Sequence, residues 1–185
     1  MSALRILGYV IVSADGMLAD ANGIMPQELK IPGDQRFFTE AMDHVDLIVH
    51  GRNSFEDQPR SALRKRIVLS THTTTVAADP DNGRATLWNP EGASFDQALD
   101  QTGLRGGTIA VIGGPNVFEM FFERFDTFWL SQAPHVHIPD GTPVFPGVPQ
   151  KSPQDVLAAH GLAAGQPILI DAEQDVYVTP WQRLG

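Results

Sequence analysis

The stretch Thr108-Ile-Ala-Val-Ile-Gly-Gly-Pro-Asn-Val-Phe-Glu119 predicts a buried β-strand that stops at two glycines and turns directly into a helix. Its first half is uncharged and rich in strand-forming residues, as a strand covered on both faces requires. Gly113 and Gly114 allow a close approach to a ligand, and Pro115 suits the first turn of a helix. Because a helix N-terminus offers free N–H groups, the turn suits a pyrophosphate. A tight turn in any α/β protein has the same pattern.

Composition limits the class of protein. The 185 residues suit one domain over residues 1–185, and a net charge of −9 argues against nucleic acid and anionic membrane surfaces. The absence of cysteine excludes a disulfide scaffold, a thiolate nucleophile and a cysteine-ligated metal. No run of eighteen apolar residues occurs, and residues 1–20 do not resemble a signal peptide. We therefore expect a soluble, cytoplasmic protein.

Hydrophobic patterning along the chain predicts an α/β fold with a mostly parallel sheet. Strands are predicted over residues 4–12, 45–50, 66–70, 84–88, 108–112 and 127–132. Helices are predicted over residues 34–44, 94–101 and 152–160, with another after Pro115. Two short β runs, 167–171 and 175–179, predict a C-terminal antiparallel hairpin. Residues 19–33 read as an irregular loop.

A basic cluster stands out from the acidic background. Five of the thirteen Lys and Arg residues fall within fifteen positions, at Arg52, Arg60, Arg64, Lys65 and Arg66. Such a cluster can hold a small polyanion through charge-assisted contacts. A solvated loop between two elements is the alternative.

Several motifs of known chemistry are absent. The sequence has no Gly-x-Gly-x-x-Gly, no phosphate-binding Gly-Lys-Ser/Thr loop, no His-Glu-x-x-His and no Gly-x-Ser-x-Gly. His135 and His137 could share a strand face and hold a metal. No acidic partner is near in sequence, so two surface histidines are the favoured interpretation, and we expect no metal site.

Four blocks resemble the dihydrofolate reductase superfamily in order and rough spacing. The family forms are an Asp at the start of the first helix, Gly-Arg-x-Thr-x-Glu, Ile-x-Leu-Ser and Ile-Gly-Gly-x-x-x-Tyr/Phe. In this chain they are Ile31-Pro-Gly-Asp34 with Phe38, Gly51-Arg-Asn-Ser-Phe-Glu56, Ile67-Val-Leu-Ser-Thr71 and Ile112-Gly-Gly-Pro-Asn-Val-Phe-Glu119. The resemblance implies a dihydrofolate-reductase-like three-layer fold, and the terminal hairpin extends it over most of the chain.

A fifth block indicates the subfamily. Ser13-Ala-Asp-Gly-Met-Leu-Ala19 is similar to Ser-Leu-Asp-Gly-x-Ile-Ala of the C-terminal reductase domain of RibD, the riboflavin-pathway deaminase–reductase. The block at Asp34 looks more like dihydrofolate reductase, yet Gln27 stands where bacterial dihydrofolate reductases commonly carry tryptophan. The chain resembles a stand-alone member between the two groups, and RibD-like reductases suggest a homodimer.

The resemblance implies NADPH as cofactor, lying across the carboxyl ends of the central strands. The turn at Gly51, Asn53 and Ser54 would meet the pyrophosphate, and Arg52 would lie near the extra ribose phosphate. The remaining implied contacts are Ser70, Thr71 and His72 at that phosphate, Gly113 and Gly114 near the nicotinamide, Asn116 and Val117 toward the adenine, and the backbones of Ile11 and Leu18 at the carboxamide.

Two carboxylates compete for the chemistry. Asp34 is the leading candidate for orienting and protonating a heterocycle, because a carboxylate in an apolar cleft has a raised pKa. The alternative is that Asp34 serves as a helix N-cap. Asp15 would lie beside the nicotinamide by resemblance to RibD, or be half of an Asp-Gly turn. Phe38, Phe55 and Phe118 are expected in the core, although Phe38 falls where the family packs against the bound ring.

Three functions follow from these residues. The first is an NADPH-dependent reductase of the RibD type, acting on a small heterocycle such as 5-amino-6-(5-phosphoribosylamino)uracil. The second is a dihydrofolate reductase acting on a pterin. The third is a nucleotide-binding protein without turnover. Asp15 with Gly16 favours the first, and Asp34 favours the second.

Overall fold

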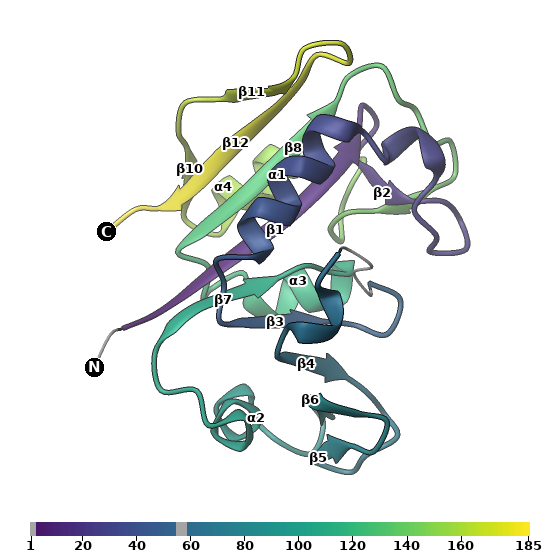
Figure 1. The fold of residues 1–185 in the computed structure, drawn as a ribbon. Helices are drawn as coiled ribbons and strands as arrows, with labels where there is room; N and C mark the ends of the chain where they lie inside the picture. The colour runs from purple at the N-terminus through teal and green to yellow at the C-terminus, as the bar shows by residue number, and fades with distance from the viewer. Residues whose placement is uncertain (1–2, 55–58) are drawn as a thin grey trace.

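The computed structural model describes residues 3–54 and 59–185, and ten of its strands form one sheet (Figure 1). These strands are β1 (Leu4–Ser13), β3 (Leu47–His50), β4 (Arg66–Leu69), β5 (Val76–Asp79), β6 (Asn82–Trp88), β7 (Gly107–Val111), β8 (Thr127–Ala133), β10 (Leu162–Ala164), β11 (Ile168–Asp171) and β12 (Val176–Arg183). Their order is β10-β12-β8-β1-β7-β3-β4-β6-β5, with β11 paired to β12. The six consecutive strands β8, β1, β7, β3, β4 and β6 run parallel to one another. Strand β12 is antiparallel to β8, β10 and β11, and β5 is antiparallel to β6.

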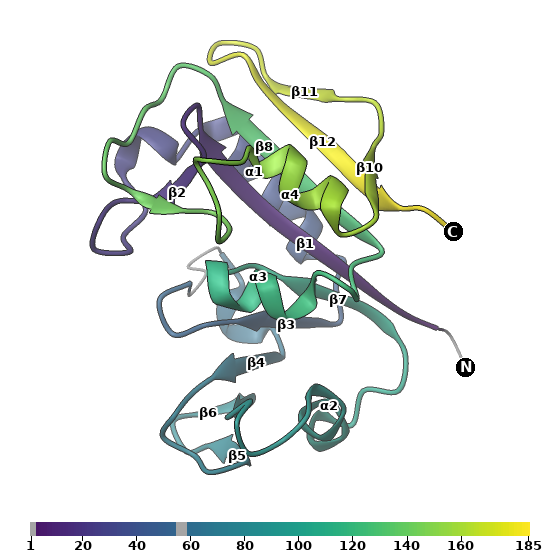
Figure 2. The ribbon, with the colours of Figure 1, turned by 180° about the vertical axis from the view of Figure 1, so that it is seen from behind.

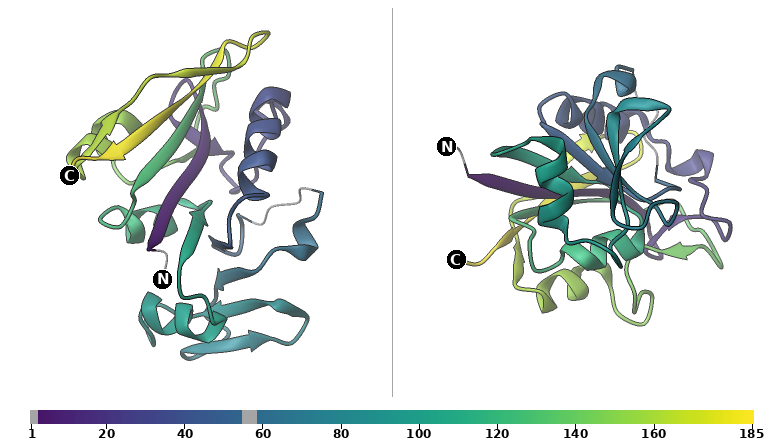
Figure 3. Two further views of the ribbon diagram at one scale, coloured as in Figure 1. Left: turned by 60° about the vertical axis from the view of Figure 1, so that its left-hand side comes forward. Right: turned by 90° about the horizontal axis from the view of Figure 1, so that it is seen from below.

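Helices cover both faces of the sheet and give three layers. Helix α1 (Pro32–Met42) lies on one face in Figure 1, and α3 (Pro115–Phe121) and α4 (Pro153–Ala159) lie on the other in Figure 2. Helix α2 (Phe95–Thr102) packs beside α3, where the ring centroids of Phe95 and Phe121 are 4.9 Å apart. Figure 3 shows the strong twist of the sheet between these layers.

The central strands are buried on both faces, as their uncharged sequences predict. Ile109, Ala110 and Val111 of β7 have no exposed surface. Behind the sheet, α3 and its neighbours contribute a cluster of interlocking aromatic rings, formed by Phe118, Phe121, Phe122, Phe125, Phe128 and Phe145. Phe118 therefore belongs to the core, as expected.

The predicted α/β class, mostly parallel sheet and terminal hairpin are confirmed, with small shifts at the element ends. The helix predicted from Asp34 begins at Pro32. Ser94 and Ser152 cap α2 and α4 with their side chains, as hydroxyl residues at helix starts commonly do. Four short strands were not predicted: β5, β10, and the separate pair β2 (Met17–Ala19) and β9 (Thr142–Pro143).

The irregular loop predicted at 19–33 contains a single 3₁₀ turn, η1 (Gln27–Leu29), and a second turn, η2 (Ser61–Leu63), precedes β4. None of the helices in residues 3–54 and 59–185 is long and apolar enough to cross a membrane.

Arg183, at the end of β12, holds the ends of two helical segments together. Its guanidinium donates to the carbonyl oxygens of Phe125 at 2.7 Å and His160 at 2.8 Å, and also to that of Phe122. These carbonyls follow α3 and α4, where helical geometry leaves acceptors without partners.

Replacing this guanidinium should destabilise the fold. We expect Arg183→Met to lower the free energy of unfolding by about 2–4 kcal/mol, because several partly buried carbonyls lose a charged donor together. Chemical denaturation measures the change. Arg105→Met is the matched control, since Arg105 pairs with Asp100 on the open surface and should contribute little. Equal effects of the two substitutions would contradict the assignment.

Candidate functional site

A cleft of about 240 Å³ opens beside α1 and reaches the central strands. Its walls come from α1, the middle of β1 and β8, the residue after β7 and the turn after β3. Aromatic and aliphatic side chains dominate the lining, with Tyr9, Val10, Ile11, Leu18, Met25, Phe37, Phe38, Ile112 and Trp129. The polar side chains are fewer, namely Lys30, Asp34, Gln35, Asn53, Ser54 and Ser131. An apolar cleft with a few polar groups is typical of a small-molecule site.

Asp34 is the buried acidic group of this cleft, with only 8% of its surface exposed. Burial raises the pKa of its carboxyl to about 6, and a hydrogen bond with the Ser131 side chain opposes part of that rise. The residue can therefore hold a proton close to neutral pH. Asp34 is not the N-cap of α1, because Ile31 occupies that position without a side-chain hydrogen bond. The N-cap interpretation of Asp34 is therefore wrong.

The first turn of α1 is capped by the C-terminal hairpin instead. The N–H of Gly33 donates to Oδ2 of Asp171 at 2.9 Å, across 138 residues of sequence. Hydrogen bonds from the backbone N–H groups of Gly33 and Gln174 hold the pKa of Asp171 below its usual range. A Cβ on Gly33 would lie 2.0 Å from the carbonyl oxygen of Ile170, so helix and strand backbones touch here. Because Asp34 follows Gly33 in the first turn of α1, this contact also fixes the position of Asp34 in the cleft.

The double glycine and the turn after β3 meet at one edge of the sheet. The N–H of Gly51 donates to the carbonyl oxygen of Gly113 at 2.8 Å. Gly113 has φ +116°, a conformation that favours glycine, and the Gly113–Gly114 peptide is cis. A Cβ on Gly113 or Gly114 would lie 3.2 or 3.4 Å from Oγ of Ser54. The two blocks form a narrow cradle of backbone and one hydroxyl.

Other predicted cofactor residues lie along the same edge. Ile11 and Leu18 line the cleft from β1 and β2, and so do Asn53 and Ser54. Asn116 is exposed at the start of α3, whereas Val117 is buried, with Cγ2 3.4 Å from a Cβ built on Gly51.

The predicted phosphate-binding residues follow neighbouring strands. Arg52 is exposed in the turn after β3, and Thr71 and His72 are exposed after β4. Ser70, which directly precedes Thr71, is buried, and its Oγ accepts a hydrogen bond from the His72 N–H at 3.1 Å. Since β3 and β4 are parallel neighbours, both turns end at the same edge of the sheet.

Asp15 holds a loop together, and it is not one of the described residues that line the cleft. Its carboxylate accepts hydrogen bonds from the Ser13 hydroxyl and from the Ile138 N–H, the latter at 3.1 Å. Burial would raise the pKa of Asp15, but these hydrogen bonds outweigh it and the pKa is lowered. Gly16 follows with φ +86°. The geometry favours the Asp-Gly turn interpretation.

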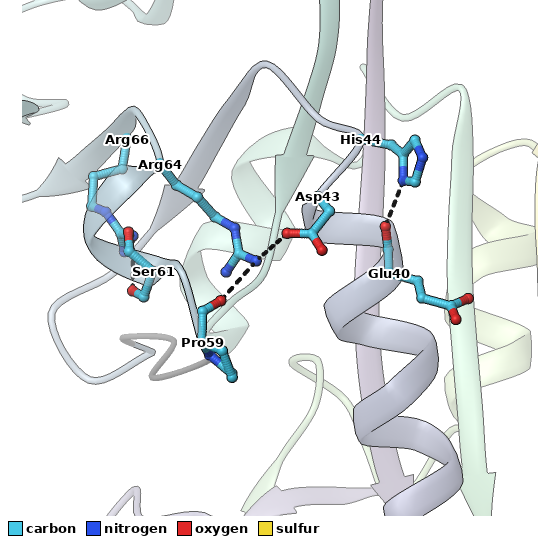
Figure 4. A network of polar contacts seen from close by, with 7 residues as sticks. All are labelled: Glu40, Asp43, His44, Pro59, Ser61, Arg64 and Arg66. Carbon is cyan, nitrogen blue, oxygen red and sulfur yellow. Dashed lines mark hydrogen bonds and ion pairs between the residues drawn. The ribbon is translucent and has the colours of Figure 1, made fainter.

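Three members of the basic cluster make contacts within the protein, and Figure 4 shows two of them, Arg64 and Arg66. Arg64 pairs with Asp43 at 2.8 Å, at the end of α1, and lowers the pKa of that carboxyl. The Lys65 ammonium donates to the Thr102 carbonyl at 3.0 Å, and Arg66 donates to Ser61 O at 2.8 Å. The hypothesis that all five residues hold a polyanion therefore narrows to Arg52 and Arg60, whose side chains are exposed.

The remaining candidates fall outside the cleft or outside the described residues. His135 pairs with Asp175 at 2.8 Å on the exposed surface, and the described residues contain no group of three or more His, Asp or Glu side chains arranged to hold a metal. Phe38 lines the cleft rather than the deep core. Phe55, and Glu56 of the same block, lie outside the described residues.

Sequence reasoning missed Trp129 and Ser131, which line the cleft from β8. Alternate residues of a strand share one face, so both face α1 from β8. No motif marks them, because a strand predicted to be buried on both faces does not reveal which side meets a cleft.

The solved structures that share this fold include a dihydrofolate reductase and a protein assigned to riboflavin biosynthesis. One is dihydrofolate reductase from Enterococcus faecalis complexed with NADP(H) and RAB-propyl, with 17% identity, a TM-score of 0.64, and coverage of 98% of this chain and 97% of that one. The other, a protein assigned to riboflavin biosynthesis from Shewanella sp. PV-4, has 19% identity, a TM-score of 0.66, and coverage of 98% and 99%. No protein-family model matches the sequence, and no curated protein matches it either. The chain has the dihydrofolate-reductase-like fold that its sequence blocks predict.

Contact between α1 and β11 makes Gly33 a sensitive position. We expect Gly33→Ala to push the first turn of α1 away from Ile170, because the new methyl would overlap a backbone carbonyl. Stability should fall by roughly 1–3 kcal/mol, and the NMR signal of the Asp34 carboxyl should shift. Gly83→Ala is the control for adding a methyl, since nothing lies within 4 Å of that position and its φ is not positive. An unchanged Asp34 signal in a folded Gly33→Ala protein would contradict this account.

Proposed function

We propose that this chain, acting as one reductase domain over residues 1–185, is an NADPH-dependent reductase of the RibD C-terminal type. Its substrate would be a small heterocycle such as 5-amino-6-(5-phosphoribosylamino)uracil. The observation that carries reduction of a heterocycle is a buried carboxyl with a raised pKa, Asp34, in an apolar cleft that also contains Ser54 from the glycine cradle. The choice of the RibD type over a dihydrofolate reductase rests on the resemblance of the block Ser13-Ala-Asp-Gly-Met-Leu-Ala19.

The residues of the cradle suit a dinucleotide. Gly51, Gly113 and Gly114 keep the strand-end backbone open, and the Ser54 hydroxyl lies against the two glycines. Arg52, exposed in the same turn, would pair with the ribose phosphate that distinguishes NADPH from NADH. When bound, the nicotinamide supplies the hydride.

Asp34 supplies what the hydride chemistry lacks, a group that orients the heterocycle and manages a proton. Its carboxyl can exchange a proton near neutral pH, and the bond with Ser131 orients it. Tyr9, Phe37 and Trp129 form an aromatic wall that excludes water around it. Asp15, engaged with Ser13 and Ile138, would serve the loop beside the cleft.

A pterin is the second candidate substrate, which would make the chain a dihydrofolate reductase. Asp34 in the first turn of α1 favours it, as does the fold shared with a dihydrofolate reductase that binds NADP(H). Turnover assays with dihydrofolate and with the aminopyrimidine separate the two. Binding of NADPH without oxidation by either substrate would leave the third function, a nucleotide-binding protein. Homodimer formation and a cytoplasmic location stay predictions.

Cofactor choice should depend on Arg52. We expect wild-type protein to bind NADPH more tightly than NADH, and Arg52→Ala to weaken NADPH alone by roughly 1.5–3 kcal/mol, since one charge-assisted contact is lost. Titration of both proteins with both nucleotides measures this. Arg84→Ala, an exposed arginine of β6, is the control for lost positive charge. Equal affinity of wild-type protein for NADPH and NADH would end the assignment.

Asp34 should be essential to the reductive step and unfavourable for stability. We expect Asp34→Asn to lower kcat roughly a hundredfold or more at neutral pH while NADPH affinity persists, and the residual rate should rise as pH falls. Asp15→Asn should change kcat little. The opposite ranking of the two variants would move the chemistry to the loop at Ser13.

The stability of Asp34→Asn provides a check that needs no substrate. The folded pKa of about 6 lies above the unfolded value of 3.8, so wild-type stability from this group is full below pH 3.8 and is lost as pH rises through 6. The free energy of unfolding of Asp34→Asn, relative to wild type, should therefore increase by up to roughly 3 kcal/mol as the pH rises from 4 to 8. Unfolding measured across that range tests it, and a pH-independent difference would show that the pKa is not raised.

A further inference from the structure

Two buried polar side chains adjoin the cradle and have no part in the chemistry above. His50, the last residue of β3, and Arg66, the first residue of β4, are each only 2% exposed. Nη1 of Arg66 lies 3.1 Å from Nε2 of His50, and Nη2 donates to the Ser61 carbonyl at 2.8 Å. Burying a cation beside a histidine costs free energy that an apolar pair of similar size would avoid. The pair therefore requires an explanation.

Hydrogen-bond chemistry fixes the tautomer of His50. A guanidinium only donates, so Nε2 of His50 must accept from Arg66 and carry no proton. The ring proton then resides on Nδ1, which lies 2.7 Å from the carbonyl oxygen of Gly51. A carbonyl oxygen only accepts, so this second contact requires the same tautomer. Arg66 thus makes His50 a donor to Gly51.

That donor sets the orientation of the next peptide group. The Gly51 carbonyl oxygen accepts from Nδ1 of His50 and from the Ser54 N–H at 3.3 Å, which closes the turn. In a trans peptide the carbonyl and the following N–H point in opposite directions. Holding the Gly51 carbonyl toward His50 therefore aims the Arg52 N–H away from it. The Gly51 N–H is already bound to Gly113, so both peptide groups at Gly51 are fixed.

We infer that His50 is a positioning residue for a pyrophosphate-binding turn at Gly51–Ser54, and that Arg66 acts through it by fixing the donor tautomer. The inference rests on the proposed nucleotide site. A turn whose peptide groups are already oriented binds an anion without first losing conformational freedom. His50 and Arg66 touch no nucleotide in this role.

Two amide substitutions separate the two nitrogen atoms of the ring. The side-chain amide of asparagine reaches the place of Nδ1, and that of glutamine reaches the place of Nε2. We expect His50→Asn to keep NADPH affinity within about threefold, and His50→Gln to weaken NADPH by roughly tenfold, the equivalent of one hydrogen bond. Isothermal titration measures both, and thermal unfolding records any general loss of structure.

Ligand fragments place the loss at the pyrophosphate. 2′-Phospho-ADP-ribose contains the pyrophosphate and should follow NADPH in every variant. Adenosine 2′-monophosphate lacks it and should bind all variants equally. His44→Gln is the matched control, because Nδ1 of His44 also bonds a backbone carbonyl, that of Glu40 at 2.7 Å, on the exposed end of α1 (Figure 4).

The outcomes are distinct. Equal losses in His50→Asn and His50→Gln, or an equal loss for adenosine 2′-monophosphate, would overturn the positioning role while leaving the nucleotide site intact. Nitrogen-15 NMR of the wild-type imidazole adds a measurement that needs no variant, and a proton on Nε2 would overturn the inference directly. Failure of wild-type protein to bind NADPH or 2′-phospho-ADP-ribose would overturn the proposed function and this role with it.

Discussion

Parallel pairing of β1, β7 and β3 is the constraint on which the rest of the structure depends. It brings the carboxyl ends of these strands to one edge, where the hydrogen bond from Gly51 to Gly113 joins two turns that are 62 positions apart in sequence. At Gly113 the backbone itself requires glycine, because φ is +116° and a Cβ would lie 3.2 Å from Oγ of Ser54. The cradle is thus a consequence of sheet topology, and the cleft extends from it toward α1.

The fold was largely predictable because its signals are local. An uncharged strand followed by Gly113-Gly114-Pro115 predicts a strand, a turn and a helix within a dozen residues, and Asp34 could be identified from its place in one block. Ser131, Asp171 and His50 could not be identified, because each acts through a partner distant in sequence or buried in a neighbouring strand. Short β strands such as β2 and β10 were missed for the same reason, since pairing rather than composition creates them.

Burial of Asp34 is unfavourable for the fold and favourable for chemistry. An apolar wall raises the pKa of the carboxyl, and the ionised form is then disfavoured at neutral pH. The same helix start is held by Asp171, a second carboxylate, whose hydrogen bonds with backbone N–H groups favour its charged form. Two aspartates near the same helix start thus have opposite pKa shifts, one set by desolvation and the other by backbone donors.

The cap that Asp171 provides has a consequence for how the chain reaches its final state during synthesis. The strands of the glycine cradle are all complete by residue 111, whereas the partner of Gly33 lies 138 residues after it. Contacts over such separations form slowly, and the N-terminal part of a chain emerges first. The edge that would receive a nucleotide can therefore assemble before the helix bearing Asp34 is locked. Helix α1, which carries Asp34, can acquire its Asp171 cap only once the hairpin of β11 and β12 has been synthesised and paired.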